Sequence, residues 1–193
     1  EAVIVSTART PIGKAFRGAF NNTQAQELGA HAILNAVQRA GIDPALVEDV
    51  VIGCAAQQGS SGGITARQSL LRAGLPVTVS GMTIDRMCSS GLMAIATAAK
   101  QVVVDGMQVT VGGGLESISL VQSGKPNTHR ARDPYLMEHI PALYMAMIET
   151  AEIVADRYGI SREAQDEYSV QSQTRTAQAQ KEGYVNEITA RID

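Results

Sequence analysis

The chain has 193 residues, enough for one large domain, with 16 Lys and Arg against 19 Asp and Glu and a formal net charge of −3 at pH 7. It has neither a basic excess nor a Lys/Arg tract, which argues against nucleic acid as a partner, and its 45% of hydrophobic residues excludes a wholly disordered chain. No uninterrupted apolar run reaches the roughly 18 residues of a membrane span, and the first residues form a predicted strand rather than a signal peptide.

Strands and helices alternate in the prediction for the first part of the chain. Residues 47–54 are almost all apolar, as in a buried parallel strand, and residues 89–104 are so apolar that we expect a helix buried on nearly all sides. This order predicts an α/β fold, with helices packed on a parallel sheet through right-handed crossovers. Strands are predicted at 2–7, 47–54, 79–86 and 107–111, and helices at 65–73, 89–104 and between a capping Thr23 and a terminating Gly41.

The pattern changes after residue 116. Residues 123–141 carry Pro, Gly, His and charged residues without periodicity, which predicts an extended loop. Two helices are expected next, at 142–158 and 162–183, the second capped by Ser161. We therefore expect two domains: a sheet domain at 1–116, and an excursion at 117–193 that acts as a lid and is incomplete at its C-terminal end.

Two cysteines are too few for a disulfide framework in a chain of this length, and neither has metal-ligand spacing around it, so free thiols in a reducing compartment and no metal site are expected. Cys54 lies in an apolar run and is predicted to be an inert core residue. Cys88 lies where a predicted strand meets the apolar helix. Helix N-termini favour thiolates and can stabilise an oxyanion on an attacked carbonyl. From its position alone, Cys88 could be either a nucleophile or an inert small residue packed in a tight turn.

The surroundings of Cys88 give three further expectations. If strand alternation continues, Arg86 faces the same side as Cys88 and lowers the pKa of its thiol. Residues 112–114 are all Gly but lack the pattern of a phosphate loop, so they are expected to let the backbone bend closely around a site. The histidines have no spacing that fixes one near Cys88, so the base is either one of them or lies outside this chain. They are His31, His129 and His139.

Five short motifs resemble the successive signatures of the thiolase family, in its order and spacing, and the resemblance runs from residue 1 to about 188. They are Ala8-Arg9-Thr10-Pro11-Ile12-Gly13, Met87-Cys88-Ser89-Ser90-Gly91-Leu92, Gly113-Gly114-Leu115-Glu116-Ser117, Glu149-Thr150-Ala151-Glu152 and Ser161-Arg162-Glu163-Ala164-Gln165-Asp166. By this resemblance the chain is the N-terminal half of a thiolase-like layered fold, with helices on both faces of a mixed, mostly parallel sheet and a helical loop domain.

The resemblance implies an acyltransferase of fatty acid metabolism and β-oxidation, acting by thiolysis of 3-ketoacyl-CoA or by Claisen condensation of acetyl-CoA. Cys88 matches the family nucleophile, which holds the acyl group as a thioester and passes it to coenzyme A or to an acetyl-CoA carbanion. Coenzyme A and acyl-CoA are then substrates, and no permanently bound cofactor is expected. A homodimer or homotetramer in the bacterial cytoplasm is implied, with a eukaryotic organelle as the alternative location.

Three departures from the family pattern matter. Asp85 stands where the family usually has Asn, and alternation predicts that its carboxylate points away from Cys88. Of the family's His-Met-Gly triplet along the coenzyme channel, only Met147 carries over as a substrate-binding residue, because its neighbours are Ala146 and Ile148. The His, the Asn-His pair and the second Cys that the family's C-terminal half supplies are not present here. That half is therefore an expected partner.

Two other functions stay open. A ketoacyl synthase of the same fold also places a Cys before Ser-Ser at a helix start, although the motif at 9–11 and that at 114–117 argue against it. A thiolase-like protein could instead bind acyl-CoA or lipid without catalysis, which the retained Cys88 argues against.

Overall fold

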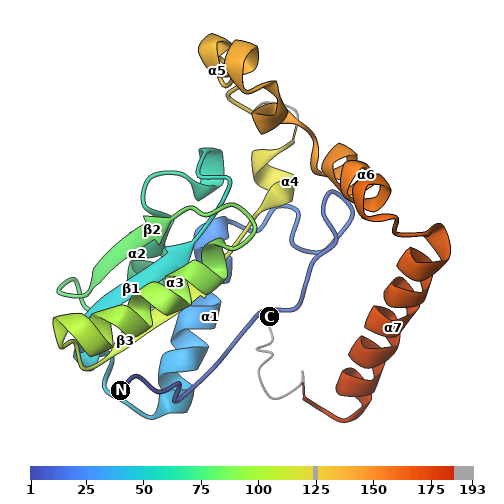
Figure 1. Ribbon diagram of the computed structural model, residues 1–193. Helices are drawn as coiled ribbons and strands as arrows, with labels where there is room; N and C mark the ends of the chain where they lie inside the picture. The colour runs from blue at the N-terminus through green and yellow to red at the C-terminus, as the bar shows by residue number, and fades with distance from the viewer. Residues whose placement is uncertain (124–125, 185–193) are drawn as a thin grey trace. The chain divides into compact units, whose positions relative to one another are not determined.

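The computed structural model describes residues 1–123 and 126–184. The chain divides into two compact units: Glu1–Pro126 makes up most of the first, and Asn127–Glu187 is the second. The division by contacts therefore falls about ten residues after the predicted boundary at 116/117. Each unit is described by itself below, and Figure 1 shows the elements of both.

The first unit is built on a parallel three-stranded sheet in the order β2-β1-β3. The strands are β1 (Asp49–Gly53), β2 (Ser80–Ile84) and β3 (Thr110–Gly114). Asp49 is in register with both Ser80 and Thr110, so the three strands end together at one edge. Every residue of β1 is buried, which confirms the prediction of a central parallel strand.

The predicted strand at 2–7 is wrong. In the part of the chain that the structure describes, these residues have no strand structure, and Val3, Ile4 and Val5 are largely exposed. β-Branched residues raise strand propensity, but a strand forms only when a neighbour accepts its hydrogen bonds. The two ladders of the described sheet join β1 to β2 and β1 to β3 only.

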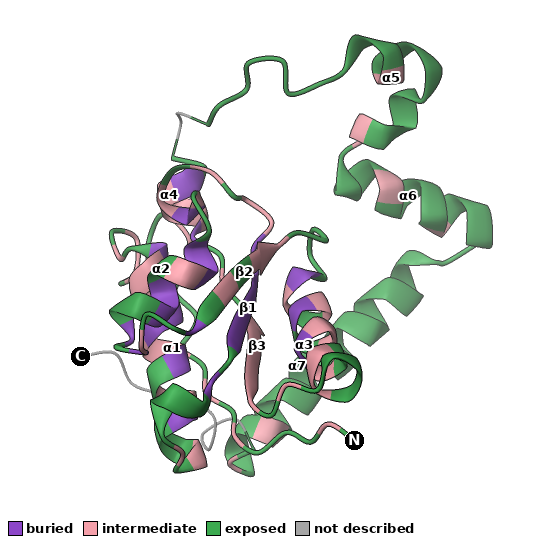
Figure 2. Ribbon diagram, turned by 90° about the vertical axis from the view of Figure 1, so that its left-hand side faces the viewer, coloured by how far each residue is buried: buried purple, intermediate pink, exposed green. Residues whose placement is uncertain are grey.

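Helices cover both faces of the sheet (Figure 2). On one face, α1 (Ala25–Ala40) and α2 (Thr65–Arg72) pack with β1 in the larger core, to which Ile33, Leu70 and Val50 belong. On the other face, α3 (Ser90–Lys100) packs Ala94 and Ala98 against Val51. The layered α/β architecture follows from β1 being apolar on both faces.

The termini of α1 match the prediction at one end only. Gly41 follows the helix with a φ of 67°, the left-handed conformation of a C-terminal glycine, as predicted. At the start, Gln24 rather than Thr23 occupies the capping position, and its side chain makes no capping hydrogen bond. The predicted capping box at Thr23 is therefore wrong.

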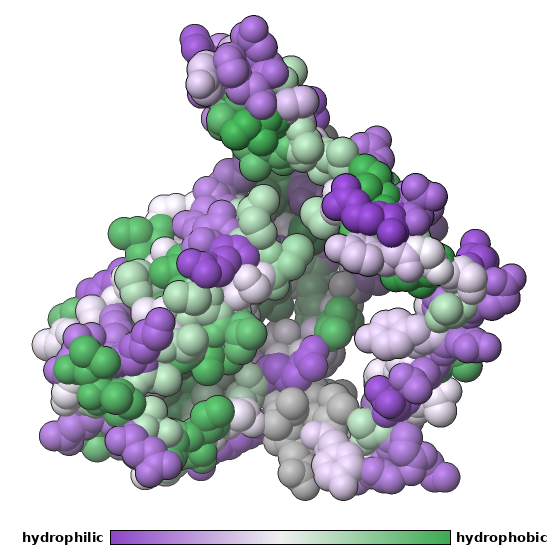
Figure 3. Space-filling model, viewed as in Figure 1, coloured by the Kyte–Doolittle hydropathy of each residue, from purple (hydrophilic) through white to green (hydrophobic). Residues whose placement is uncertain are grey.

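Helix α3 is buried on one face only, contrary to the prediction. Its buried residues are Ser90, Ala94 and Ala98, whereas the side chain of Leu92 is 71% exposed and that of Val104, in the π-helical continuation Gln101–Asp105, is 77% exposed. Figure 3 shows hydrophobic side chains on the outer surface of this region. Within the described residues, Met87–Asp105 is the one helical segment long and apolar enough to cross a membrane by length and composition, a test that core helices also pass.

The second unit is helical. It contains α5 (Pro134–His139), a 3₁₀ turn at Pro141–Tyr144, α6 (Met147–Tyr158) and α7 (Arg162–Lys181). Helix α5 interrupts the loop predicted at 123–141 because Asp133 caps it: its carboxylate accepts hydrogen bonds from the backbone N–H groups of Tyr135 and Leu136. The predicted cap of α7 is confirmed, since Ser161 Oγ accepts from the Ala164 N–H at 3.2 Å. The first unit ends with the short α4 (Ile118–Val121) and also holds 3₁₀ turns at Pro44–Leu46 and Gly59–Ser61.

Candidate active site

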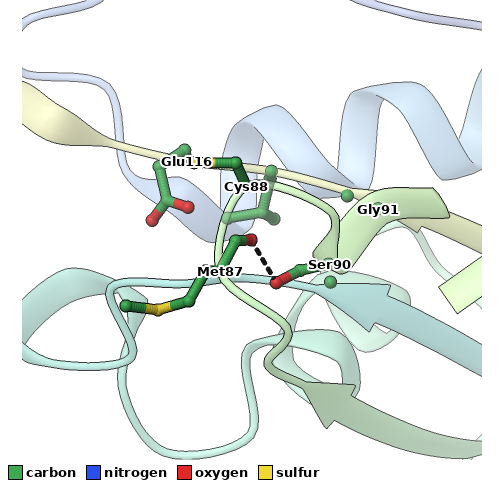
Figure 4. Close-up of a pocket in the computed structure, with 8 residues that line it drawn as sticks. Met87, Cys88, Ser90, Gly91 and Glu116 are labelled. Atoms are coloured by element: carbon green, nitrogen blue, oxygen red, sulfur yellow. Dashed lines mark hydrogen bonds between the residues drawn. The ribbon is translucent and has the colours of Figure 1, made fainter. Parts of the chain in front are cut away.

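An open pocket of about 410 Å³ lies in the first unit, where β1 and β3 end and α3 begins (Figure 4). Carboxyl ends of parallel strands are the usual position of ligand sites in α/β folds. The lining residues come from these ends and from the turn before α3: Gly53, Met87, Cys88, Ser90, Gly91, Gly114, Leu115 and Glu116. The pocket therefore contains Cys88 and the carboxylate of Glu116.

Cys88 is an exposed free thiol on a tight turn, two residues before the first residue of α3. Met87, beside it, has a φ of 50°, a left-handed conformation that costs a non-glycine residue roughly 1–2 kcal/mol. The turn is closed by the Ser89 N–H, which donates to the Arg86 carbonyl at 3.1 Å. Cys88 therefore lies at the start of a helix, as predicted, and faces an open pocket.

The side chains of Ser90 and Asp85 hold this turn by hydrogen bonds to its backbone. Ser90 is only 3% exposed, and its Oγ accepts from the Arg86 N–H at 2.8 Å and donates to the Met87 carbonyl at 2.6 Å. The Asp85 carboxylate accepts from the Met87 N–H at 2.7 Å. Cys88 thus projects from a turn in which the backbone N–H and carbonyl groups of Arg86 and Met87 are hydrogen-bonded.

Glycines allow α3 to begin directly on the sheet. A Cβ at Gly53 would lie 2.2 Å from the carbonyl carbon of Ser90, and one at Gly114 would lie 3.0 Å from the Cα of Gly91. A Cβ at Gly112 would lie 2.8 Å from the Cα of Ile95. The predicted close approach of the backbone at 112–114 is therefore confirmed for Gly112 and Gly114, which lie against α3, but not for Gly113, where a Cβ would meet only the Ile52 Cδ1 at 3.9 Å.

Cys54, at the end of β1, is fully buried, as predicted. Burial, together with the negative charge and hydrogen bond of Glu116, raises the pKa of the Cys54 thiol to about 12. Its Sγ lies 3.5 Å from Glu116 Oε1. Cys54 is therefore a protonated core thiol at neutral pH, unsuited to nucleophilic attack.

The sequence analysis did not single out Glu116 as a site residue. Its carboxylate accepts hydrogen bonds from the backbone N–H groups of Ala55 and Ala56, both at 3.0 Å. It thus joins the loop after β1 to the end of β3 in the wall of the Cys88 pocket. Its position two residues after the glycine run that follows a predicted strand was the available signal.

Residues 2–191 match the family model described as thiolase, N-terminal domain. The chain belongs to the thiolase family. It is 42% identical over 185 residues to the 3-ketoacyl-CoA thiolase of Bacillus subtilis, covering 95% of this chain and 46% of that protein. It is 38% identical over 200 residues to the acetyl-CoA acetyltransferase of Cupriavidus necator, covering 97% of this chain and 50% of that protein.

The fold agrees with this assignment. The crystal structure of the Bacillus anthracis acetyl-CoA acetyltransferase matches with a TM-score of 0.80 and 36% identity, covering 97% of this chain and 50% of that one. The predicted thiolase-like layered α/β fold is confirmed, and the three described strands are parallel. The chain spans about half the length of the curated relatives it matches.

The structure also gives the positions of Arg86, Asp85 and Met147, the other residues to which the sequence assigned a role. The alternation argument for Arg86 is wrong, because β2 ends at Ile84 and the chain then turns at Met87. The Asp85 carboxylate points into the turn, where it is hydrogen-bonded to the backbone. Met147 is the exposed first residue of α6, in the second unit, so its contact with coenzyme A stays a prediction.

The histidines give no base within the described pocket. His31 lies on α1 and is not among the residues that line the Cys88 pocket. His129 and His139 belong to the second unit and are exposed. The His139 Nδ1 lies 2.8 Å from the Tyr135 carbonyl oxygen, and its ring stacks on that of Tyr135.

Proposed function

We propose that the protein containing this chain is an acyl-CoA C-acyltransferase, a thiolase that forms an acyl thioester on Cys88. One observation carries the proposal: Cys88 is an exposed thiol on a turn at the start of α3, in an open pocket, within a chain of the thiolase family. The names of its relatives, 3-ketoacyl-CoA thiolase and acetyl-CoA acetyltransferase, support the reaction class.

In the degradative direction, the Cys88 thiolate attacks the 3-keto carbonyl of a 3-ketoacyl-CoA. The bond between C2 and C3 then breaks, its electron pair stays on C2, and protonation of C2 gives acetyl-CoA. The thiol of a second coenzyme A attacks the acyl-enzyme and releases a shortened acyl-CoA together with the free Cys88 thiolate. The condensation of two acetyl-CoA molecules is the reverse sequence.

Thiolate chemistry suits this exchange. The acyl-enzyme is itself a thioester, so it is close in free energy to the acyl-CoA from which it forms. The Ser89 and Ser90 N–H groups already bond to carbonyls of the turn, so the donors for the oxyanion of the tetrahedral intermediate are other backbone N–H groups at the start of α3. The open pocket leaves Cys88 accessible to a thioester from the solvent side.

The proposal includes partners beyond this chain. Acyl-CoA and coenzyme A are the substrates, with Met147 contacting coenzyme A and no permanently bound cofactor. The C-terminal half of the fold supplies the base and further oxyanion donors. We propose a homodimer or homotetramer in the bacterial cytoplasm that binds no nucleic acid. We also propose that α3 does not span a membrane, because one of its faces packs on β1 and β3.

Replacing the nucleophile tests the function. In the complete protein, Cys88→Ser should lower the rate of acetoacetyl-CoA thiolysis on the order of 1,000-fold or more, because a serine hydroxyl is not ionised at neutral pH. The matched control is Cys54→Ser, which changes the other thiol and should retain the rate within about tenfold, since Cys54 Sγ is buried. Turnover by Cys88→Ser within tenfold of wild type would contradict the assignment. Wild-type protein that binds acyl-CoA without any turnover would favour the non-catalytic alternative.

A further inference from the structure

The turn that presents Cys88 needs support from its surroundings. Met87 adopts a left-handed φ of 50° without being glycine, and such conformations persist only where neighbouring groups hold them. The Met87 side chain is 71% exposed and Cys88 is exposed as well, so neither is anchored by packing in a core. The support must come from hydrogen bonds to the backbone of the turn.

Ser90 and Asp85 provide these hydrogen bonds. The buried Ser90 hydroxyl joins the Arg86 N–H, at 2.8 Å, to the Met87 carbonyl, at 2.6 Å, so one side chain bonds to the peptide group before Arg86 and to the peptide group after Met87. The Asp85 Oδ1 fixes the Met87 N–H at 2.7 Å and lies 3.4 Å from Ser90 Oγ. Figure 4 shows the bond from Ser90 to Met87, with Cys88 on the same turn.

We propose that Asp85 and Ser90 are positioning residues that hold the Cys88 thiol at the geometry required for attack on the acyl carbon. This proposal rests on the proposed function. Neither side chain needs to contact the substrate, because both act through the backbone of residues 86 and 87. A shift of the reacting atom by about 1 Å can lower a rate roughly 100-fold.

The geometry separates the hydrogen bond of Asp85 from its charge. A single oxygen, Oδ1, accepts the hydrogen bond from the Met87 N–H, and an asparagine side chain offers an equivalent oxygen at the same place. Asp85→Asn should therefore preserve the turn, whereas Asp85→Ala should release the Met87 N–H.

The experiment compares four variants in the complete protein: Ser90→Ala, Asp85→Ala, Asp85→Asn and Ser89→Ala. Ser89 is the matched control. Its exposed hydroxyl lies in the same turn and donates to the Arg86 carbonyl, whereas the buried Ser90 hydroxyl also accepts from the Arg86 N–H. The readouts are the kcat and KM of thiolysis, the rate of Cys88 acylation by acetyl-CoA, and hydrogen exchange of the backbone amides of residues 86 and 87.

We expect Ser90→Ala to lower kcat and the acylation rate about 10- to 100-fold, to leave KM within about threefold, and to speed amide exchange at residues 86 and 87. Asp85→Ala should show a similar but smaller loss, which Asp85→Asn restores. Ser89→Ala should stay within about threefold of wild type.

Different outcomes separate the two proposals. If wild-type Cys88 is not acylated, the proposed function fails, and amide exchange still decides whether Ser90 and Asp85 hold the turn. If wild-type Cys88 is acylated and Ser90→Ala reacts equally fast, the positioning role is overturned. Equal losses in Ser89→Ala and Ser90→Ala, or unchanged exchange in Ser90→Ala, would also overturn it. If Ser90→Ala does not fold, the comparison of Asp85→Ala with Asp85→Asn makes the same test.

Discussion

Cys54 and Cys88 carry the same thiol in opposite surroundings. Cys54 is buried beside the Glu116 carboxylate, and its thiol pKa is raised from 9.0 to about 12, whereas Cys88 is exposed in the pocket. Below pH 9 both the folded and the unfolded chain keep the Cys54 proton. Between about pH 9 and 12 the unfolded chain loses that proton and the folded chain keeps it, so this thiol lowers the free energy of unfolding as the pH rises.

This linkage predicts a measurable difference between wild type and Cys54→Ser. The serine hydroxyl still donates a hydrogen bond but does not titrate in this range. Relative to the variant, the wild-type protein should lose roughly 2–3 kcal/mol of unfolding free energy between pH 8 and pH 11. Denaturant unfolding of both proteins across this range measures it. Parallel curves for the two proteins would show that the folded state does not retain the Cys54 proton.

At the residue scale, the sequence predicted the environment of a residue where its immediate neighbours determine that environment. The burial of Cys54 and the position of Cys88 at a helix start could both be predicted from the flanking residues. The role of Glu116 could not, because it bonds to backbone groups at residues 55 and 56, which only the folded chain brings near. The role of Ser90 depends on the turn at Met87, which the strand alternation did not predict. Strand alternation also failed to predict the orientation of Asp85. Its carboxylate accepts a hydrogen bond from the Met87 N–H, because the chain turns at Met87 instead of continuing as a strand.

At the scale of elements, close backbone packing determines where α3 begins. Gly53→Ala should lower the free energy of unfolding by about 3 kcal/mol, because the new Cβ would meet the backbone of Ser90 and Gly91, which no side-chain rotation can relieve. Gly113→Ala is the matched control, since its Cβ would have only the Ile52 Cδ1 at 3.9 Å, an ordinary contact. It should cost less than about 1 kcal/mol.

Chemical denaturation of both glycine variants measures these changes. The close approach of β1 and α3 would be refuted by equal stability of Gly53→Ala and Gly113→Ala. Loss of Cys88 acylation in Gly53→Ala at a temperature where it remains folded would further support the dependence of the Cys88 turn on this packing.

Helices and strands whose own residues show the pattern of that element could be predicted from the sequence. Strands β1 to β3 and helices α1, α2, α6 and α7 form within a few residues of their predicted positions. The strand at 2–7 was wrong because strand formation depends on a pairing partner, which apolar composition does not specify. Helix α5 was not predicted because six residues are too few to show a helical period, and its start depends on the Asp133 cap.

At the scale of the whole molecule, the outer face of α3 and its continuation leave large apolar side chains of the first unit exposed. Leu92, Ile95, Val103 and Val104 are all exposed along it. Soluble monomers rarely leave such contiguous apolar patches uncovered. We therefore expect the 193-residue chain, expressed alone, to self-associate and to show no thiolysis, since we propose that the other half of the fold contributes the base.

Light scattering over a range of concentrations measures this association. The double variant Leu92→Gln/Val104→Gln should associate less than wild type, whereas Val170→Gln, at an exposed position of α7, should not differ from it. A stable wild-type monomer at all concentrations would contradict the packing argument. The burial of α3 on all sides was predicted from its composition alone, and composition does not distinguish a face that the sheet covers from one that another segment would cover.

The acyl-enzyme itself is the most direct test of the account. The complete protein is mixed with acetyl-CoA, quenched in acid, and analysed by intact-mass and peptide mass spectrometry. The account predicts one acetyl group per chain, bound to Cys88, released on addition of coenzyme A, and absent from Cys88→Ser. No mass gain, or an acetyl group that maps to Cys54, would contradict the assignment of Cys88 as the acyl-accepting nucleophile.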